Sequence, residues 1–185
     1  MKRSITIAGY IAVTIALSAV LQAQTTHPVT ELKVGDMAPN FTLQGSNGKT
    51  YSLADFKDKK AVVIAWFPAA FTQGCTIECK SLADNGEKIK QFDVTYFMAS
   101  VDPVAKNTDF AHAQNADFPL LSDPDKKTAE AFGVLNARGV ANRWTFYIGK
   151  DGKILAIEKA VKPATSAEDM VKKLGELGVA KTASN

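Results

Sequence analysis

The sequence predicts an α/β fold built on a central mixed sheet with helices on its faces. The first supporting observation is a continuous apolar run at residues 61–67, typical of a strand covered on both sides. The second is the alternation of strand-like and helical segments after that run, which predicts parallel strands joined by helices. The chain has 185 residues, 46% hydrophobic and 22% charged, which suits one domain with a sizeable core.

An N-terminal β-hairpin is expected before that strand. Residues 41–43 and 50–53 have the pattern of strands, and Asn47-Gly48 between them is a strong signal for a hairpin turn. After the buried strand, residues 75–92 have a helical pattern. The apolar side chains available for the inner face of this helix are those of Ile77, Leu82, Ile89 and Phe92.

The second half of the chain continues the alternation. The expected elements are a strand at 94–101, a helix at 103–115, a short strand at 120–121, a helix from 123 to 132, strands at 145–148 and 154–158, and a helix at 166–177. Asp102-Pro103 predicts a helix start, as an N-cap followed by proline, and Asp151-Gly152 predicts a second hairpin. This order is that of the thioredoxin fold, here with an N-terminal hairpin and an inserted helical region. The fold by itself assigns no function.

Residues 1–23 have the layout of a secretory signal peptide. Lys2 and Arg3 precede an apolar run of 17 residues, and Ala23 offers a small residue at the cleavage position, although Leu21 is large for this motif. We expect cleavage and a periplasmic or secreted protein. The alternative is an uncleaved membrane anchor facing the periplasm, because the run approaches the length that spans a bilayer.

The rest of the chain divides into a polar linker at 24–31, one domain at 32–179 and a small polar tail at 180–185. Cleavage removes two basic residues and no acidic residue, so the net charge falls from +3 to +1. This balance does not favour nucleic acid as a partner. Once the signal is cleaved, we expect no stable membrane partner.

Cys75 and Cys79 are the only cysteines in the chain. Pro68 precedes Cys75 by seven residues and Thr72 precedes it by three, in the stretch PAAFTQGCTIEC at 68–79. The buried strand ends just before Pro68, and a helical pattern begins at Cys75. Cys75 is therefore expected at a helix N-terminus, where unpaired N–H groups and the helix dipole favour a thiolate.

This motif resembles the active site of the peroxiredoxins of the AhpC/TSA type, near the bacterioferritin-comigratory (peroxiredoxin Q) branch. The resemblance covers roughly residues 34–177 and includes four further blocks: GDMAPNF at 35–41, SVD at 100–102, FPLLSD at 118–123 and RWTFYI at 143–148. It implies a thiol peroxidase that reduces hydrogen peroxide or alkyl hydroperoxides without metal, haem or flavin. It also implies a thioredoxin-like or other thiol reductant, and a monomer or homodimer.

The resemblance implies a role for each site residue. Cys75 is the peroxidatic cysteine, and Thr72 would hydrogen-bond its sulfur and the incoming peroxide. Pro68 would shield the pocket, while Arg143 would hold the thiolate and a peroxide oxygen. Glu78 would orient Arg143. Taken singly, these residues have simpler interpretations: Pro68 ends a strand, Thr72 caps a helix, Glu78 offsets the helix dipole and Arg143 lies on the surface.

Cys79 departs from the expected pattern, because the peroxiredoxin Q branch often places its resolving cysteine five residues after the peroxidatic one. Side chains at i and i+4 on a helix have Cβ atoms about 5–6 Å apart, whereas a disulfide needs about 3.8 Å. A Cys75–Cys79 disulfide therefore requires the first helical turn to open after Cys75 is oxidised to a sulfenic acid. The alternative is an inert Cys79 and an external thiol that resolves Cys75.

Other classes of function stay open. Cys-x-x-x-Cys in an exported thioredoxin fold also resembles the Sco-type copper chaperones, which need a histidine facing the cysteines. Only His27 in the linker and His112 on a predicted helix are available, and we expect His112 at the surface. A thiol:disulfide oxidoreductase is less favoured because it needs Cys-x-x-Cys and a cis-proline. A structural disulfide is less favoured because its loop is too short to constrain the unfolded chain.

Overall fold

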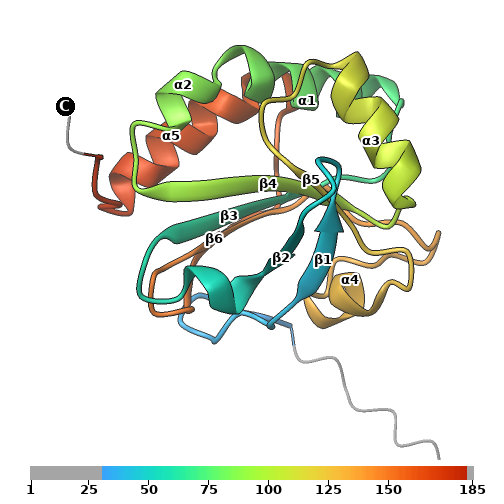
Figure 1. The fold of residues 1–185 in the computed structure, drawn as a ribbon. Helices are drawn as coiled ribbons and strands as arrows, with labels where there is room; N and C mark the ends of the chain where they lie inside the picture. The colour runs from blue at the N-terminus through green and yellow to red at the C-terminus, as the bar shows by residue number, and fades with distance from the viewer. Residues whose placement is uncertain (1–30, 183–185) are drawn as a thin grey trace, which may run out of the picture.

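The computed structural model describes residues 31–182, and the strands of this part form one seven-stranded mixed sheet in the order β2-β1-β5-β4-β3-β6-β7 (Figure 1). The strands are β1 (Thr42–Gly45), β2 (Thr50–Ser52), β3 (Ala61–Trp66), β4 (Val94–Ser100), β5 (Leu120–Ser122), β6 (Thr145–Ile148) and β7 (Ile154–Glu158). The helices are α1 (Gln73–Asp84), α2 (Gly86–Ile89), α3 (Val104–Ala113), α4 (Lys127–Ala131) and α5 (Ser166–Glu176), with 3-10 turns η1 (Leu53–Phe56) and η2 (Pro163–Thr165). The predicted α/β sheet with an N-terminal hairpin is confirmed.

The central strand β3 is buried along its whole length because helices and loops cover both faces of the sheet. Val63 and Ala65 belong to the core beneath α1, α2, α3 and α5, which lie together on one face (Figure 1). Ile64 and Trp66 point to the other core, which contains Ala129 of α4 and apolar residues of the N-terminal hairpin. Two apolar layers therefore explain why the strand has a continuous apolar sequence rather than an alternating one.

Strand pairing brings the carboxyl ends of β3 and β4 to the same edge of the sheet, because these strands are parallel in the register Ala65↔Met98. On its other side β3 pairs antiparallel with β6, in the register Ala65↔Thr145. The start of β6 therefore lies beside the end of β3. Loops from three segments distant in the sequence consequently meet at this edge.

The single helix predicted at 75–92 is in fact two helices, and the first of them begins two residues earlier than predicted. α1 starts at Gln73, and the chain bends at Asn85 before α2. The bend brings Gly86 against the sheet, where a Cβ atom would lie 2.8 Å from the Tyr96 hydroxyl oxygen. A residue with a side chain at this position would therefore have to displace the Tyr96 hydroxyl.

The inner face of α1 also differs from the expected one. Ile77 is 42% exposed, so its predicted inward position is wrong, whereas Leu82 is fully buried. The buried stripe runs through Cys75, Cys79 and Leu82, with the i, i+4, i+7 spacing of one helix face. Ile77 lies two residues from both cysteines and therefore falls on the opposite face.

Two helices begin later in the chain than predicted. α3 begins at Val104 with Pro103 as its N-cap, and the Asp102 carboxylate does not cap it. α4 begins at Lys127 rather than near Asp123. The Asp123 carboxylate still accepts a hydrogen bond from the backbone N–H of Ala129, at 2.7 Å. It therefore pairs one of the free N–H groups in the first turn of α4, although it lies four residues before that helix.

At the C-terminal end, Lys181 forms an antiparallel bridge with Phe92, which ties the first residues of the predicted polar tail to the domain. The predicted signal peptide and nearly all of the predicted linker lie outside the described residues. Within residues 31–182, no helix combines the length and apolar character needed to span a bilayer.

Candidate active site

The loop between β3 and α1 carries three of the predicted site residues. Pro68 lies half-buried in a bend one residue after Phe67, and Thr72 is the N-cap residue of α1. Between them Phe71 has φ +67°, a left-handed conformation that is unfavourable for a bulky side chain. Its ring packs edge-on against Phe110 of α3 with centroids 5.1 Å apart. The loop therefore has a strained shape that neighbouring contacts maintain.

The Thr72 hydroxyl donates a hydrogen bond to the carbonyl oxygen of Ala69 at 3.0 Å. Within the described part of the chain, no hydrogen bond joins Thr72 to Cys75, and the hydroxyl does not cap α1. With its hydrogen directed to Ala69, the Thr72 oxygen still has lone pairs to accept a hydrogen bond from another molecule.

Cys75 is the third residue of α1 and is fully buried. The Arg143 guanidinium approaches it from the segment just before β6, and its Nη2 donates a hydrogen bond to the sulfur at 3.2 Å. The backbone explains this encounter, because the N–H of Trp66 at the end of β3 donates to the carbonyl of Trp144 at 2.8 Å. Strand pairing thus places the permanent positive charge of Arg143 beside the sulfur.

Glu78 binds the other terminal nitrogen of the Arg143 guanidinium. Its side chain is fully buried, pairs with Nη1 of Arg143, and accepts a long hydrogen bond of 3.5 Å from the Ser166 hydroxyl. Burial raises the pKa of Glu78 to about 7, although Arg143 and Ser166 both act to lower it. The carboxyl group and the sulfur therefore hold the guanidinium between them.

Cys79 lies one helical turn after Cys75 and is also fully buried, and both cysteines are free thiols. Burial, assisted by the negative charges of Glu78 and Cys75, raises the pKa of Cys79 to about 12. In this folded helix Cys79 is therefore a neutral, unreactive thiol.

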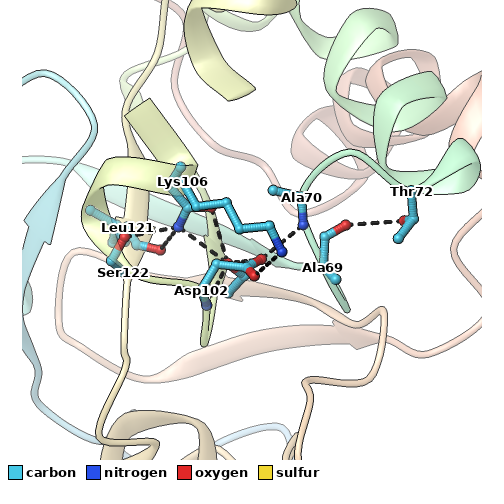
Figure 2. Close-up of polar contacts among 9 residues, drawn as sticks. Ala69, Ala70, Thr72, Asp102, Lys106, Leu121 and Ser122 are labelled. Carbon is cyan, nitrogen blue, oxygen red and sulfur yellow. Dashed lines mark hydrogen bonds and ion pairs between the residues drawn. The ribbon is translucent and has the colours of Figure 1, made fainter. Parts of the chain in front are cut away.

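Two further contacts at the site were not predicted. Ser166 reaches Glu78 from the first turn of α5. Asp102 accepts a hydrogen bond from the backbone N–H of Ala70 in the Pro68–Thr72 loop (Figure 2). Asp102 lies within the SVD block at 100–102, so the sequence indicated this residue but not its contact with Ala70. Nothing in the sequence near Ser166 indicates its contact, because α5 is brought to α1 only by packing.

The copper alternative finds no ligand set within residues 31–182, where no three His, Cys, Asp or Glu side chains gather as a metal site would require. His112 is exposed on α3, as expected, while His27 lies outside the described residues.

Comparisons with known proteins identify the family. Residues 34–157 match the AhpC/TSA family. The chain belongs to this family of peroxiredoxins. It is 35% identical over 130 residues to peroxiredoxin Bcp of Escherichia coli (strain K12), covering 66% of this chain and 83% of that protein. It is 35% identical over 140 residues to a putative peroxiredoxin of Mycobacterium tuberculosis (strain ATCC 25618 / H37Rv), covering 72% and 88%.

Solved peroxiredoxin structures have the same fold. Peroxidoxin BcpB from Mycobacterium tuberculosis superposes with a TM-score of 0.72 at 30% identity, covering 79% of this chain and 98% of that one. A cysteine-to-serine mutant of PrxQ from Xylella fastidiosa gives 0.74 at 25% identity, covering 80% and 99%. The predicted thioredoxin fold of the peroxiredoxin type is confirmed, and so is the prediction of a thiol peroxidase.

Proposed function

We propose that Cys75 is the peroxidatic residue of this peroxiredoxin and that it reduces hydrogen peroxide or an alkyl hydroperoxide. The observation that carries the proposal is the contact between Arg143 and the Cys75 sulfur, at 3.2 Å, with Glu78 anchoring the guanidinium. A sulfur at a helix N-terminus that accepts a hydrogen bond from a cation is stabilised as the thiolate, which is the nucleophile.

The first step transfers an electron pair from sulfur to the peroxide. The Cys75 thiolate forms a bond to one oxygen as the O–O bond breaks, which gives a sulfenic acid and an alkoxide or hydroxide. The sulfenic acid keeps the peroxide proton, and the leaving alkoxide or hydroxide takes a proton from solvent, so the products are the sulfenic acid and an alcohol or water. Negative charge moves from sulfur to oxygen, and the positive charge of the Arg143 guanidinium beside the sulfur stabilises it.

Thr72 and Pro68 have supporting parts in this step. Because the Thr72 hydroxyl already donates to Ala69, its oxygen is free to accept the O–H of the bound hydroperoxide and so to orient it. The half-buried ring of Pro68 limits the access of water to the sulfur. The expectation that Thr72 bonds the sulfur itself stays a prediction.

Cys79 resolves the sulfenic acid in the second step. Its sulfur attacks the Cys75 sulfur, a disulfide forms and water leaves. Opening of the first turn of α1, where the N–H of Thr76 donates to the Thr72 carbonyl, is required for the two sulfurs to meet. The same opening exposes Cys79 to water and removes the burial that raises its pKa to about 12. A thioredoxin-like or other thiol then reduces the disulfide.

The deciding measurement is the rate of thiol loss when reduced protein meets equimolar hydrogen peroxide, with the intact mass read at the end. We expect rapid loss to a product lighter by two hydrogens in the unmodified protein. Cys75→Ser should abolish the reaction, and Cys79→Ser should give rapid oxidation to a product heavier by one oxygen. A rate no faster than that of an ordinary exposed thiol would refute the proposal.

Export is a separate proposal that rests on the sequence of residues 1–23. A protein recovered from its host with Gln24 as the first residue would support cleavage and release. Recovery of the whole chain in the membrane fraction would instead support the anchored alternative.

A further inference from the structure

A buried carboxylate from outside the active-site loop holds that loop in place. Asp102 follows β4, and its Oδ2 accepts a hydrogen bond from the backbone N–H of Ala70 at 2.8 Å (Figure 2). The hydroxyl of Ser100 donates to the same oxygen at 3.1 Å, and Nζ of Lys106 contacts Oδ1 at 2.6 Å. Each carboxylate oxygen is thus occupied, and only Oδ2 faces the loop.

The carboxylate is itself rigidly placed by the sheet and α3. Asn107, fully buried on α3, donates to the Ser122 hydroxyl at 2.9 Å and also contacts the Ser100 hydroxyl, which bonds Asp102. The network therefore joins the ends of β4 and β5 to the first turn of α3. A carboxylate anchored on regular elements is a firm support for a loop.

The loop needs such a support, because its own backbone does not favour its shape. Ala70 is 4% exposed, so its N–H must find an acceptor within the protein, and Asp102 supplies it. The next residue is Phe71 in its left-handed conformation, and the two flanking residues, Ala69 and Thr72, share the hydroxyl–carbonyl hydrogen bond. The Asp102 contact lies in the middle of this turn.

We propose that Asp102 is a positioning residue for the peroxide step: its hydrogen bond to Ala70 holds the Thr72 oxygen at the place where it orients the hydroperoxide on Cys75. The inference deepens the proposed function and rests on it. Among the described contacts Asp102 bonds neither Cys75 nor Arg143, so it acts only through the loop. Misplacement of a substrate-orienting group slows the reaction without changing the nucleophile.

The test compares two reactions of the same sulfur in the reduced protein. Oxidation by hydrogen peroxide needs the orienting loop, whereas alkylation by iodoacetamide needs no orienting group and depends only on how readily the reagent reaches the buried Cys75 sulfur. We expect Asp102→Ala to slow oxidation by about 10- to 100-fold while alkylation stays within about threefold. The ratio of the two rates therefore reports positioning, which a general loss of packing would not change.

Three further variants separate the hydrogen bond from other effects. Asp102→Asn keeps an acceptor oxygen and should restore most of the ratio. Lys106→Met removes a half-exposed cation and leaves the bond to Ala70, so its ratio should stay within about threefold of the unmodified protein. Asp123→Ala is the matched control: it deletes another buried carboxylate that accepts backbone N–H groups, and it should lower the melting temperature without changing the ratio.

An unchanged ratio in Asp102→Ala, or an equal loss in Asp102→Ala and Asp102→Asn, would overturn the assignment. If Asp102→Ala does not fold, Asp102→Leu takes its place, because leucine fills a similar volume without an acceptor. The same fall in the ratio of oxidation to alkylation is expected, and an unchanged ratio would again overturn the assignment. The proposed function is tested separately by the unmodified protein. Slow oxidation there refutes the peroxidase, whereas fast oxidation in both proteins refutes only the role of Asp102.

Discussion

Replacing Glu78 by glutamine tests how the site holds its cation. Glu78→Gln keeps the shape of the side chain and one acceptor oxygen, but it removes the charge that pairs with Arg143. The guanidinium then has a weaker anchor, and its contact with the Cys75 sulfur becomes less well defined. We expect slower oxidation of Cys75 by hydrogen peroxide.

The expected size follows from the strength of the lost contact. A hydrogen bond to a charged group contributes roughly 1.5–3 kcal/mol and a neutral one about 1 kcal/mol. A net loss of about 1–2 kcal/mol in the transition state slows the reaction by about 5- to 30-fold.

The effect has a pH dependence of defined direction. Because burial raises the pKa of Glu78 to about 7, its carboxyl group gains a proton as the pH falls through that value. The protonated acid resembles the amide of the variant. The ratio of the unmodified rate to the Glu78→Gln rate should therefore be largest above about pH 7 and decline towards unity below it.

The stability of the protein should change over the same pH range, in a direction that the raised pKa of Glu78 sets. The folded pKa of Glu78, about 7, exceeds the ordinary value of 4.5, so the folded state holds this proton more tightly than the unfolded chain. The resulting contribution to the free energy of unfolding, about 3 kcal/mol, is complete at low pH and is lost as the pH rises to the folded pKa. Glu78→Gln lacks it and should gain stability relative to the unmodified protein as the pH rises.

Stopped-flow oxidation and denaturant unfolding across this pH range measure the two effects. Glu87→Gln is a suitable control, because Glu87 on α2 is 89% exposed and its loss should leave both measurements unchanged. A rate ratio that is independent of pH, or a variant as fast as the unmodified protein above neutral pH, would refute the anchoring role of Glu78.

Three other substitutions separate an effect on the oxidation rate from an effect on stability. In Gly74→Ala the new Cβ would lie 3.1 Å from Nη2 of Arg143, so displacement of the guanidinium from Cys75 should slow oxidation about tenfold while helix stability rises slightly. Gly175→Ala, with open space at its Cβ, should stabilise α5 without a change in rate; equal rates in both variants would contradict the prediction. Leu82→Ala should lower the free energy of unfolding by about 2–5 kcal/mol in a denaturant titration, because the side chain is fully buried under α1, and a loss below about 1 kcal/mol would count against this packing.

Much of the fold could be predicted because burial leaves a local record in the sequence. The apolar run that became β3 is continuous since both faces of the strand are covered, and the turn residues at Gly48 and Gly152 have the positive φ that hairpin turns need. The spacing of Pro68, Thr72 and Cys75 could also be interpreted from the sequence. All three belong to one strand–loop–helix connection, whose geometry depends on residues close in the chain.

Helix details were predicted less well because they depend on what the helix packs against. The sequence pattern continues through Asn85, but the close approach of Gly86 to Tyr96 requires a bend there. Ile77 looks like a core residue by composition, yet the buried stripe follows the two cysteines instead. Apolar character alone cannot assign a face when several registers of the helix are equally apolar.

By itself, then, the sequence determined the α/β class, the order of the elements and the cysteine motif at a strand-to-helix junction. Only the tertiary structure decided which distant groups contact Cys75 and its loop. Arg143 is 68 residues from Cys75 and reaches it through the pairing of β6 with β3, while Asp102 reaches Ala70 from the end of β4. Local spacing encodes local backbone geometry, whereas contacts between separate strands depend on sheet register and packing, which no short stretch of sequence contains.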